Sequence, residues 1–260
     1  MTPSPLAVQV AHVARRSIFR TMRQPAMIVP GVTFPLFLLA VNAGGLDAAT
    51  HLPGFPTDSY LTFALAITFM QAALFATNAG GNDLAEDIRT GFLSRLSLTP
   101  LRGSALLAGQ LAGVVALGLF QACVFIAVGL AAGGTIEAGA PGVLVLIALA
   151  VLTSLAFGAV GVLIGLRTGS GEAVQGFFPL LFVLLFLSSM SLPRDLIAQD
   201  WFRTVATWNP VSYLIEGFRS LLITGWDGEA LALGFAFAIG IFALALWGSA
   251  AALRTRMVRT

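Results

Sequence analysis

The stretch Asn82–Arg102 reads NDLAEDIRTGFLSRLSLTPLR and lies between two long apolar runs. Its large apolar residues recur at every fourth position, which on a helix places them in one row; they are Leu84, Ile88, Phe92 and Leu96. Gly91 can break this helix, and the Thr99-Pro100 step can end it. A segment this short and this charged does not cross a bilayer, and its apolar row needs a surface to cover it. The stretch therefore predicts a helix lying on the lipid interface or on another protein, with a solvated loop as the simpler alternative.

The composition indicates an integral membrane protein. Of 260 residues, 57% are hydrophobic and only 10% are charged, with a mean hydropathy of +0.91. Soluble domains carry about a quarter charged residues. All 14 basic residues are arginine, and they lie scattered at the edges of apolar runs with a net charge of only +2. This distribution does not indicate nucleic-acid binding.

Six windows without charged residues are long enough to cross the bilayer core, which is about 30 Å thick and needs roughly 20 helical residues. We expect an all-α protein with six transmembrane helices in one domain over residues 1–260, with spans at about 26–46, 59–82, 104–132, 142–166, 173–192 and 230–253. An even number of spans places both termini on the same side of the membrane.

The arginines are divided unequally between the two sides that these spans define. One side carries the N-terminal arm, the loops between spans 2 and 3 and between spans 4 and 5, and the C-terminal tail. The other side holds only Arg194, Arg203 and Arg219. Because positive charge collects on the cytoplasmic side, we expect both termini and Asn82–Arg102 to be cytoplasmic, in the cytoplasmic membrane of a prokaryote.

The N-terminal arm predicts a helix before the first span. Arg16, Arg20 and Arg23 share one face of it, with Ile18 and Met22 roughly opposite. This pattern is typical of a helix in the membrane interface, and a plain positively charged flank is the alternative. Glycines repeat in the third span (Gly109, Gly113, Gly118) and in the fourth (Gly158, Gly161, Gly165), which predicts close helix packing.

The segment 193–228 is too polar for an ordinary span and too apolar for a free loop. Its tryptophans, together with Tyr213, are typical of a membrane interface. We expect two short re-entrant helices facing the outer leaflet, with Leu214 and Phe218 buried. Glu216 and Arg219, three residues apart, are expected to stay near the headgroups and to pair with each other.

Several chemistries are excluded or disfavoured by what the sequence lacks. The phosphate-binding motif GxxxxGK[ST] needs a lysine, and the chain has none, so the chain is not itself an ATPase. No charged residue lies inside the expected spans, which argues against a proton- or ion-coupled transporter. His12, His51 and Cys123 are isolated, so we expect no metal site. The polar residues within or beside the spans are candidates for substrate contacts, with helix-packing hydrogen bonds as the alternative; they are Asn42, Gln71, Asn78 and Gln175.

Two motifs resemble the permease subunits of type-2 ABC exporters, of the kind that exports daunorubicin and nodulation factors. The first is an acidic pair, a Gly, an Arg-Leu step, Thr-Pro and an Arg, carried by Glu86, Asp87, Gly91, Arg95, Leu96, Thr99, Pro100 and Arg102. It departs from the family at Ser94, where an acid is common. The second lies in Asn209–Arg219 and reads NP…Y…E…R.

The resemblance implies roles for both motifs. In that family the first segment is a cytoplasmic coupling helix that docks onto a separate ATPase subunit. The implied coupling residues are Glu86, Asp87, Arg89, Gly91, Phe92, Arg95, Leu96, Thr99, Pro100 and Arg102. Re-entrant helices between spans 5 and 6 close the outer end of the pathway. The implied gate residues are Trp201, Asn209, Pro210, Tyr213, Glu216 and Arg219.

The resemblance also implies the assembly and the cargo. The chain is expected to act with a second permease copy, identical or a close paralogue, and with two ATPase subunits that bind the ATP and Mg; it holds no cofactor itself. It is expected to contact membrane lipids and no nucleic acid, and to move an amphipathic drug, lipid or lipid-linked glycan outward. The alternatives are a secondary transporter or channel, and an integral-membrane enzyme that modifies lipids.

Overall fold

The computed structural model describes residues 5–97 and 102–259, and within them the chain is helical without a strand. Five helices are long and apolar enough to cross a membrane. They are α2 (Pro25–Gly45), α3 (Tyr60–Arg89), α5 (Gly103–Ala131), α6 (Gly139–Thr168) and α10 (Gly228–Arg259). The helix α7 (Gly171–Phe186) is apolar but shorter. The chain is therefore a multi-pass, all-helical membrane protein.

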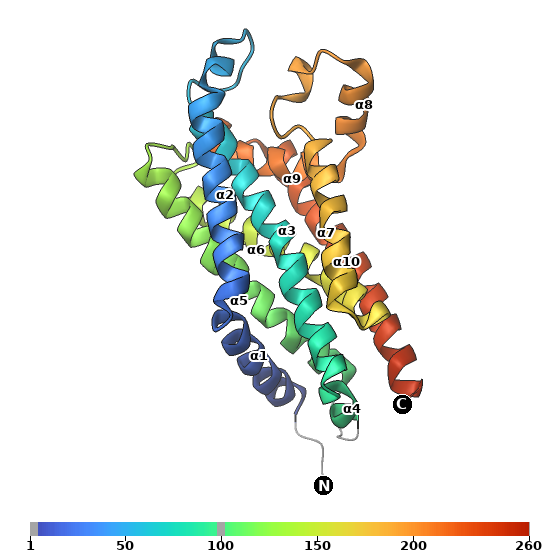
Figure 1. Ribbon diagram of the computed structural model, residues 1–260. Helices are drawn as coiled ribbons and strands as arrows, with labels where there is room; N and C mark the ends of the chain where they lie inside the picture. Colours follow the sequence, from blue (N-terminus) through green and yellow to red (C-terminus); the bar gives the residue numbers. More distant parts are fainter. Residues whose placement is uncertain (1–4, 98–101, 260) are drawn as a thin grey trace.

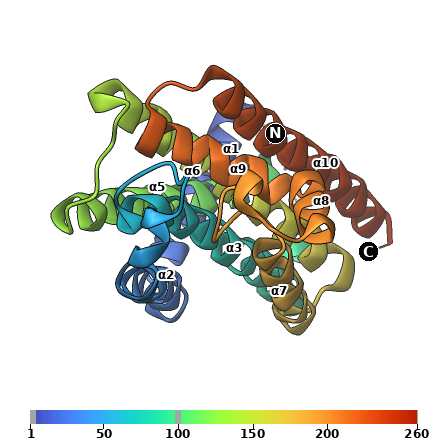
Figure 2. The same cartoon turned by 90° about the horizontal axis from the view of Figure 1, so that it is seen from above.

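The bundle is built around α3. Of the 18 most apolar consecutive residues of each helix, 89% are buried in α3, against 17% in α2 and 22% in α10. Figure 2 shows α3 and α6 in the middle of the bundle and α2 and α10 at its edges. With 30 residues, α3 is about 45 Å long, which exceeds the hydrocarbon core of about 30 Å. Its last turns therefore project beyond the apolar bundle and carry the acidic residues of the coupling segment.

Glycines bring α3 and α6 into backbone contact. A Cβ atom built on Gly161 of α6 lies 1.9 Å from the carbonyl oxygen of Thr77, and one on Gly165 lies 2.7 Å from that of Gly81. From the α3 side, a Cβ on Gly80 lies 2.6 Å from the carbonyl oxygen of Gly158. Real side chains do not approach this closely, so the two helices can pack in this way only because these positions are glycine. The close packing predicted from the glycines of the fourth span is present.

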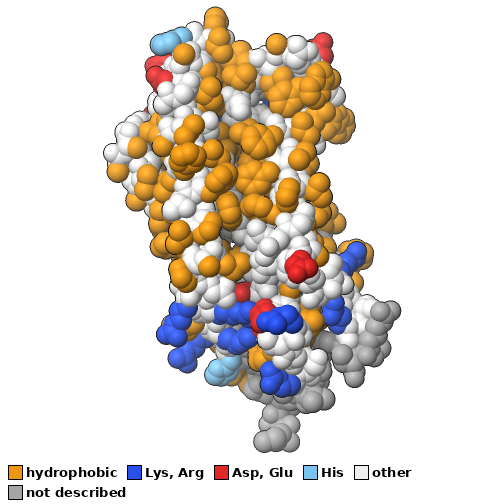
Figure 3. Space-filling view, viewed as in Figure 1, with side chains coloured by type: hydrophobic (Ala, Val, Ile, Leu, Met, Phe, Trp, Pro, Cys, Tyr) orange, Lys and Arg blue, Asp and Glu red, His pale blue; other side chains and the backbone are white. Residues whose placement is uncertain are grey.

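The short elements lie at the two ends of the bundle (Figure 1). One end carries α1 (Leu6–Met22), α4 (Phe92–Ser97) and the last turns of α10. The other carries the 3-10 turn η1 (Asp47–His51) and α8 (Asp200–Trp208). Arginine side chains gather toward the α1 end, and hydrophobic side chains cover most of the remaining face (Figure 3). A charged end and an apolar flank are the surface that a membrane-spanning bundle presents.

The fifth apolar helix is shorter than the expected span 173–192, because α7 ends at Phe186. The chain then turns at residues 187–192, where backbone carbonyls leave the helical pattern and accept hydrogen bonds from α9. It continues through η2 (Arg194–Leu196), α8, α9 (Pro210–Arg219) and the π-helical turn η3 (Ser220–Thr224). Two short helices thus stand between α7 and α10, and their insertion into the outer leaflet stays a prediction.

Candidate functional site

The coupling segment folds as two helices joined at Gly91. α3 ends at Arg89, Gly91 adopts a left-handed φ of +69°, and α4 begins at Phe92. Leu84 and Leu93 are buried, and Ile88 and Leu96 pack partly buried against the same cluster. The predicted apolar row therefore covers part of its own bundle. This corrects the expectation that the row needs an external surface, because the break at Gly91 folds α4 back onto α3.

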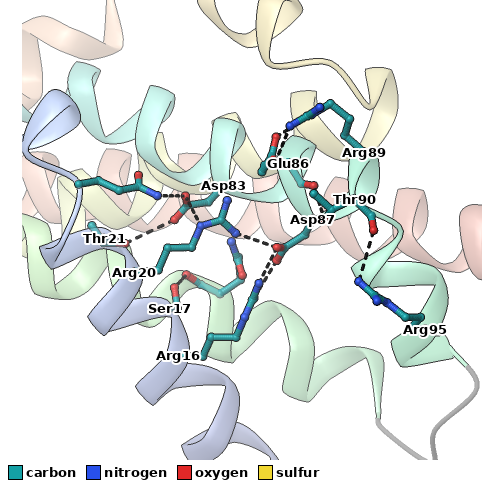
Figure 4. A network of polar contacts seen from close by, with 12 residues as sticks. Arg16, Ser17, Arg20, Thr21, Asp83, Glu86, Asp87, Arg89, Thr90 and Arg95 are labelled. Atoms are coloured by element: carbon teal, nitrogen blue, oxygen red, sulfur yellow. Dashed lines mark hydrogen bonds and ion pairs between the residues drawn. The ribbon is translucent and has the colours of Figure 1, made fainter.

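Asp87 is buried, with 2% of its surface exposed, and binds two arginines of α1. Arg16 donates to its two carboxylate oxygens at 2.9 and 2.7 Å, and Arg20 donates to Oδ1 at 2.7 Å (Figure 4). The neighbouring Asp83 lies 3.1 Å from Nε of Arg20. The hydrogen bond to Asp87 raises the pKa of Arg16. Such charge-assisted pairs are the strong polar contacts of proteins, so this cluster fixes α1 to the end of α3.

The contacts of α1 with α3 and α5 decide which of its faces is exposed, and its place in the membrane interface stays a prediction. Arg16 and Arg20 face α3, while Ser17 and Thr21 are buried against Gly113 of α5. The exposed side chains include Ile18 and Phe19, so α1 shows apolar surface outward and buries much of its polar face. The two aspartates on α3 hold Arg16 and Arg20 on the inner side of α1.

The remaining coupling residues divide into exposed and buried positions. Glu86 and Arg89 form an exposed pair at 2.7 Å, and Arg95 is exposed on α4. The ring of Phe92 lies 3.9 Å below the guanidinium of Arg16, which ties α4 to the aspartate cluster. The backbone N–H of Arg102 donates to Gln9 of α1 at 3.1 Å. Thr99 and Pro100 lie outside the described residues.

A cavity of about 370 Å³ lies between α2, α3 and α7. Two of the four polar residues predicted to contact the substrate line it, namely Asn78 and Gln175. Asn82, one helical turn beyond Asn78, also lines it, together with Phe75 and Phe178. The side-chain oxygens of Asn78 and Asn82 are buried and accept no hydrogen bond within the described chain. A cavity with aromatic walls and unsatisfied acceptors suits an amphipathic molecule that carries a donor.

The other two pathway candidates do not line this cavity. Gln71 is buried in α3 about two turns away, and Asn42 lies near the far end of α2. Asn82 was not among the predicted pathway residues, although its spacing of four residues from Asn78 places both on the same helix face.

At the opposite end, Arg219 of α9 is buried, with 7% of its surface exposed. One of its terminal nitrogens donates to the carbonyl oxygen of Ser189 at 2.6 Å, and the other donates to that of Met190. Its guanidinium lies 3.5 Å from the ring centroid of Phe63 on α3. Burial lowers its pKa. Arg219 therefore connects α9 to the turn after α7 and to α3.

The predicted pairing of Glu216 with Arg219 is wrong. Glu216 instead pairs with Arg194 and accepts a hydrogen bond from Ser189 at 3.1 Å. The prediction failed because Arg219 points into the protein, where it donates to the backbone carbonyls of Ser189 and Met190.

Five of the six predicted gate residues lie on or at the start of α9. Asn209 caps α9 by accepting from the N–H of Val211 at 3.0 Å, and Pro210 begins the helix. Tyr213 stacks on Phe237 of α10, with ring centroids 4.6 Å apart. Trp201 lies apart from them on α8, with 64% of its surface exposed. Arg194, which sequence reasoning did not assign, joins the cluster through Glu216.

Comparison with known proteins agrees with this arrangement. The ABC-2 type transporter family matches residues 8–223. A daunorubicin resistance ABC transporter permease protein, DrrB1 of Streptomyces coeruleorubidus, is 29% identical over 206 residues, which cover 76% of this chain and 69% of that protein. The family match spans the α1–α3 cluster, the coupling segment and α9. The chain therefore belongs to the ABC-2 type transporter family, as a membrane-spanning permease subunit that partners ABC ATPase subunits.

Proposed function

We propose that this permease moves an amphipathic compound, such as a drug, a lipid or a lipid-linked glycan, outward across the cytoplasmic membrane of a prokaryote. Two copies of the permease, or one copy and a close paralogue, would act with two ATPase subunits that supply ATP and Mg. The observation that carries the proposal is the family match over residues 8–223. The relative named for daunorubicin resistance supports a drug-like cargo. The cavity of Asn78 and Gln175 supports an amphipathic one.

The orientation with α1, α4 and the end of α10 in the cytoplasm is supported by the eleven-to-three division of arginines. With Cys123 replaced by Ala, a cysteine at the exposed Asp58 or Ala132 should react with an impermeant maleimide in intact cells. A cysteine at the exposed Arg254 should react only after permeabilisation. Labelling of Arg254→Cys in intact cells would show that the protein has the opposite orientation.

The ATPase-facing surface is assigned to the exposed part of the coupling segment, represented by Glu86, Arg89 and Arg95. Phe92→Asp is a poor probe of this contact, because the Phe92 ring also supports Arg16. Arg95→Glu changes an exposed side chain of α4 whose hydrogen bond, to the carbonyl of Thr90, is long at 3.4 Å. We expect Arg95→Glu to reduce co-purification of the ATPase and permease-stimulated ATP hydrolysis by about tenfold or more. A tenfold loss corresponds to about 1.4 kcal/mol, and a reversed charge at an interface costs several kcal/mol.

The matched control is Arg203→Glu, which reverses an arginine on α8 at the opposite end of the bundle. This variant should retain ATPase binding. If Arg95→Glu and Arg203→Glu bind the ATPase equally well, α4 is not the coupling surface.

The transport route is assigned to the cavity between α2, α3 and α7, with the α9 cluster as its outer gate. Asn78→Ala and Gln175→Ala each remove a polar group from the cavity, and we expect transport to fall about two- to tenfold, the range of one hydrogen bond. ATPase co-purification should be unchanged, because neither residue lies near α4. Asn42→Ala, outside the cavity, is the control. Equal transport by all three variants would place the route elsewhere.

A further inference from the structure

An apolar groove of about 510 Å³ runs along α5, between α1, α6 and α10. Its floor is one face of α5, on which apolar side chains recur every three or four residues from Ala108 to Leu119. Ile18 of α1 and Phe242 of α10 form its walls. The groove shares no lining residue with the cavity of Asn78 or with the coupling surface, so the proposed function leaves it unused.

The length of the groove along α5 matches the thickness of the hydrocarbon layer of one leaflet. From Ala108 to Leu119 there are 11 residue steps, or about 16 Å along a helix, and the hydrocarbon core is about 30 Å thick. The groove begins in the second turn of α5, which starts at Gly103, so it occupies the half of the core next to α1. An acyl chain that starts at that surface would lie along its whole length.

An exposed arginine lies close in the chain to the α1 residue that lines the groove. Arg15 lies one helical turn before Ile18 and is exposed, with its guanidinium 5.7 Å from the ring centroid of Phe19. Within the described residues Arg15 has no carboxylate partner, whereas Arg16 and Arg20 are held by Asp83 and Asp87 on the other face of α1. A basic side chain beside an apolar groove is complementary to a phosphate joined to a hydrocarbon chain.

We propose that this groove binds one anionic phospholipid from the leaflet next to α1. Its acyl chain lies against Ala108–Leu119 and its phosphate lies on Arg15. The site does not depend on the cargo or on ATPase coupling. The proposed orientation places this leaflet on the cytoplasmic side of the membrane. The cysteine labelling described above tests that orientation separately.

The test is a titration of the delipidated, full-length permease in detergent with phosphatidylglycerol or with phosphatidylcholine of the same acyl chains, followed by native mass spectrometry. The wild type should retain one phosphatidylglycerol at concentrations where phosphatidylcholine dissociates. Arg15→Gln should bind phosphatidylglycerol about fivefold more weakly, the loss expected for one arginine near an anionic surface, and phosphatidylcholine unchanged. Ala112→Trp fills the groove and should abolish retention of the lipid.

Two controls separate this site from general lipid contact. Leu244→Trp enlarges an exposed side chain of α10 that does not line the groove, and Arg254→Gln removes an exposed arginine elsewhere; both should bind like the wild type. Ala116→Leu, a smaller filling of the same groove, serves where Ala112→Trp does not yield monodisperse protein. Unchanged retention in the groove-filling variants, or equal weakening by Arg15→Gln and Arg254→Gln, would overturn the proposal.

Discussion

Asp87→Ala should destabilise the permease by about 3 kcal/mol, measured by chemical denaturation of the purified protein in detergent. The substitution removes the carboxylate that binds both Arg16 and Arg20, and these side chains then remain partly buried beside one remaining acceptor group, Asp83. Breaking a buried pair typically costs about 3–5 kcal/mol. The lower end applies here because the Arg16 side chain, 37% exposed, still reaches water.

The adjacent residue provides the control. Glu86→Ala removes a carboxylate whose pair with Arg89 is exposed, so stability should not change measurably. Equal denaturation midpoints for Asp87→Ala and Glu86→Ala would show that α1 does not depend on this cluster.

The same two residues show how far the sequence predicts the structure. The acidic pair is recognisable from its place between two apolar runs, and the family it indicates is confirmed. The sequence does not reveal that Glu86 faces outward while Asp87 binds Arg16, a residue 71 positions earlier. That contact depends on how α1 packs against α3 and α5, which the helical periodicity of either segment alone does not specify.

The outer end shows a similar division. The capping role of Asn209 and the start of α9 at Pro210 follow from local sequence, because both residues favour a helix N-terminus. The partner of Glu216 does not follow, because the spacing to Arg219 favours a local pair while the fold supplies Arg194. Local rules thus predict the helix limits here, and tertiary packing decides the ion pairs.

Gly161→Leu should have the largest effect of all and leave no folded permease after extraction into detergent. A Cβ atom at this position would lie 1.9 Å from the carbonyl oxygen of Thr77 and 3.0 Å from the backbone nitrogen of Gly81. Both neighbours are backbone atoms of the central helix, so no side chain can rotate away to make room. α6 would have to move away from α3, and every contact along the two helices would loosen.

Gly161→Ala tests the same contact with a smaller side chain. The single added methyl group should lower the free energy of unfolding by about 3 kcal/mol, the upper end of the range for overpacked sites. Gly240→Ala is the matched control, because a Cβ there meets no atom within 4 Å, and an alanine inside a helix is no less favourable than a glycine. Its recovery and thermal stability should equal or exceed those of the wild type. If Gly161→Ala behaves like Gly240→Ala, then α3 and α6 are farther apart than the backbone contact requires. The glycines of α6 would then have to be explained by something other than helix packing.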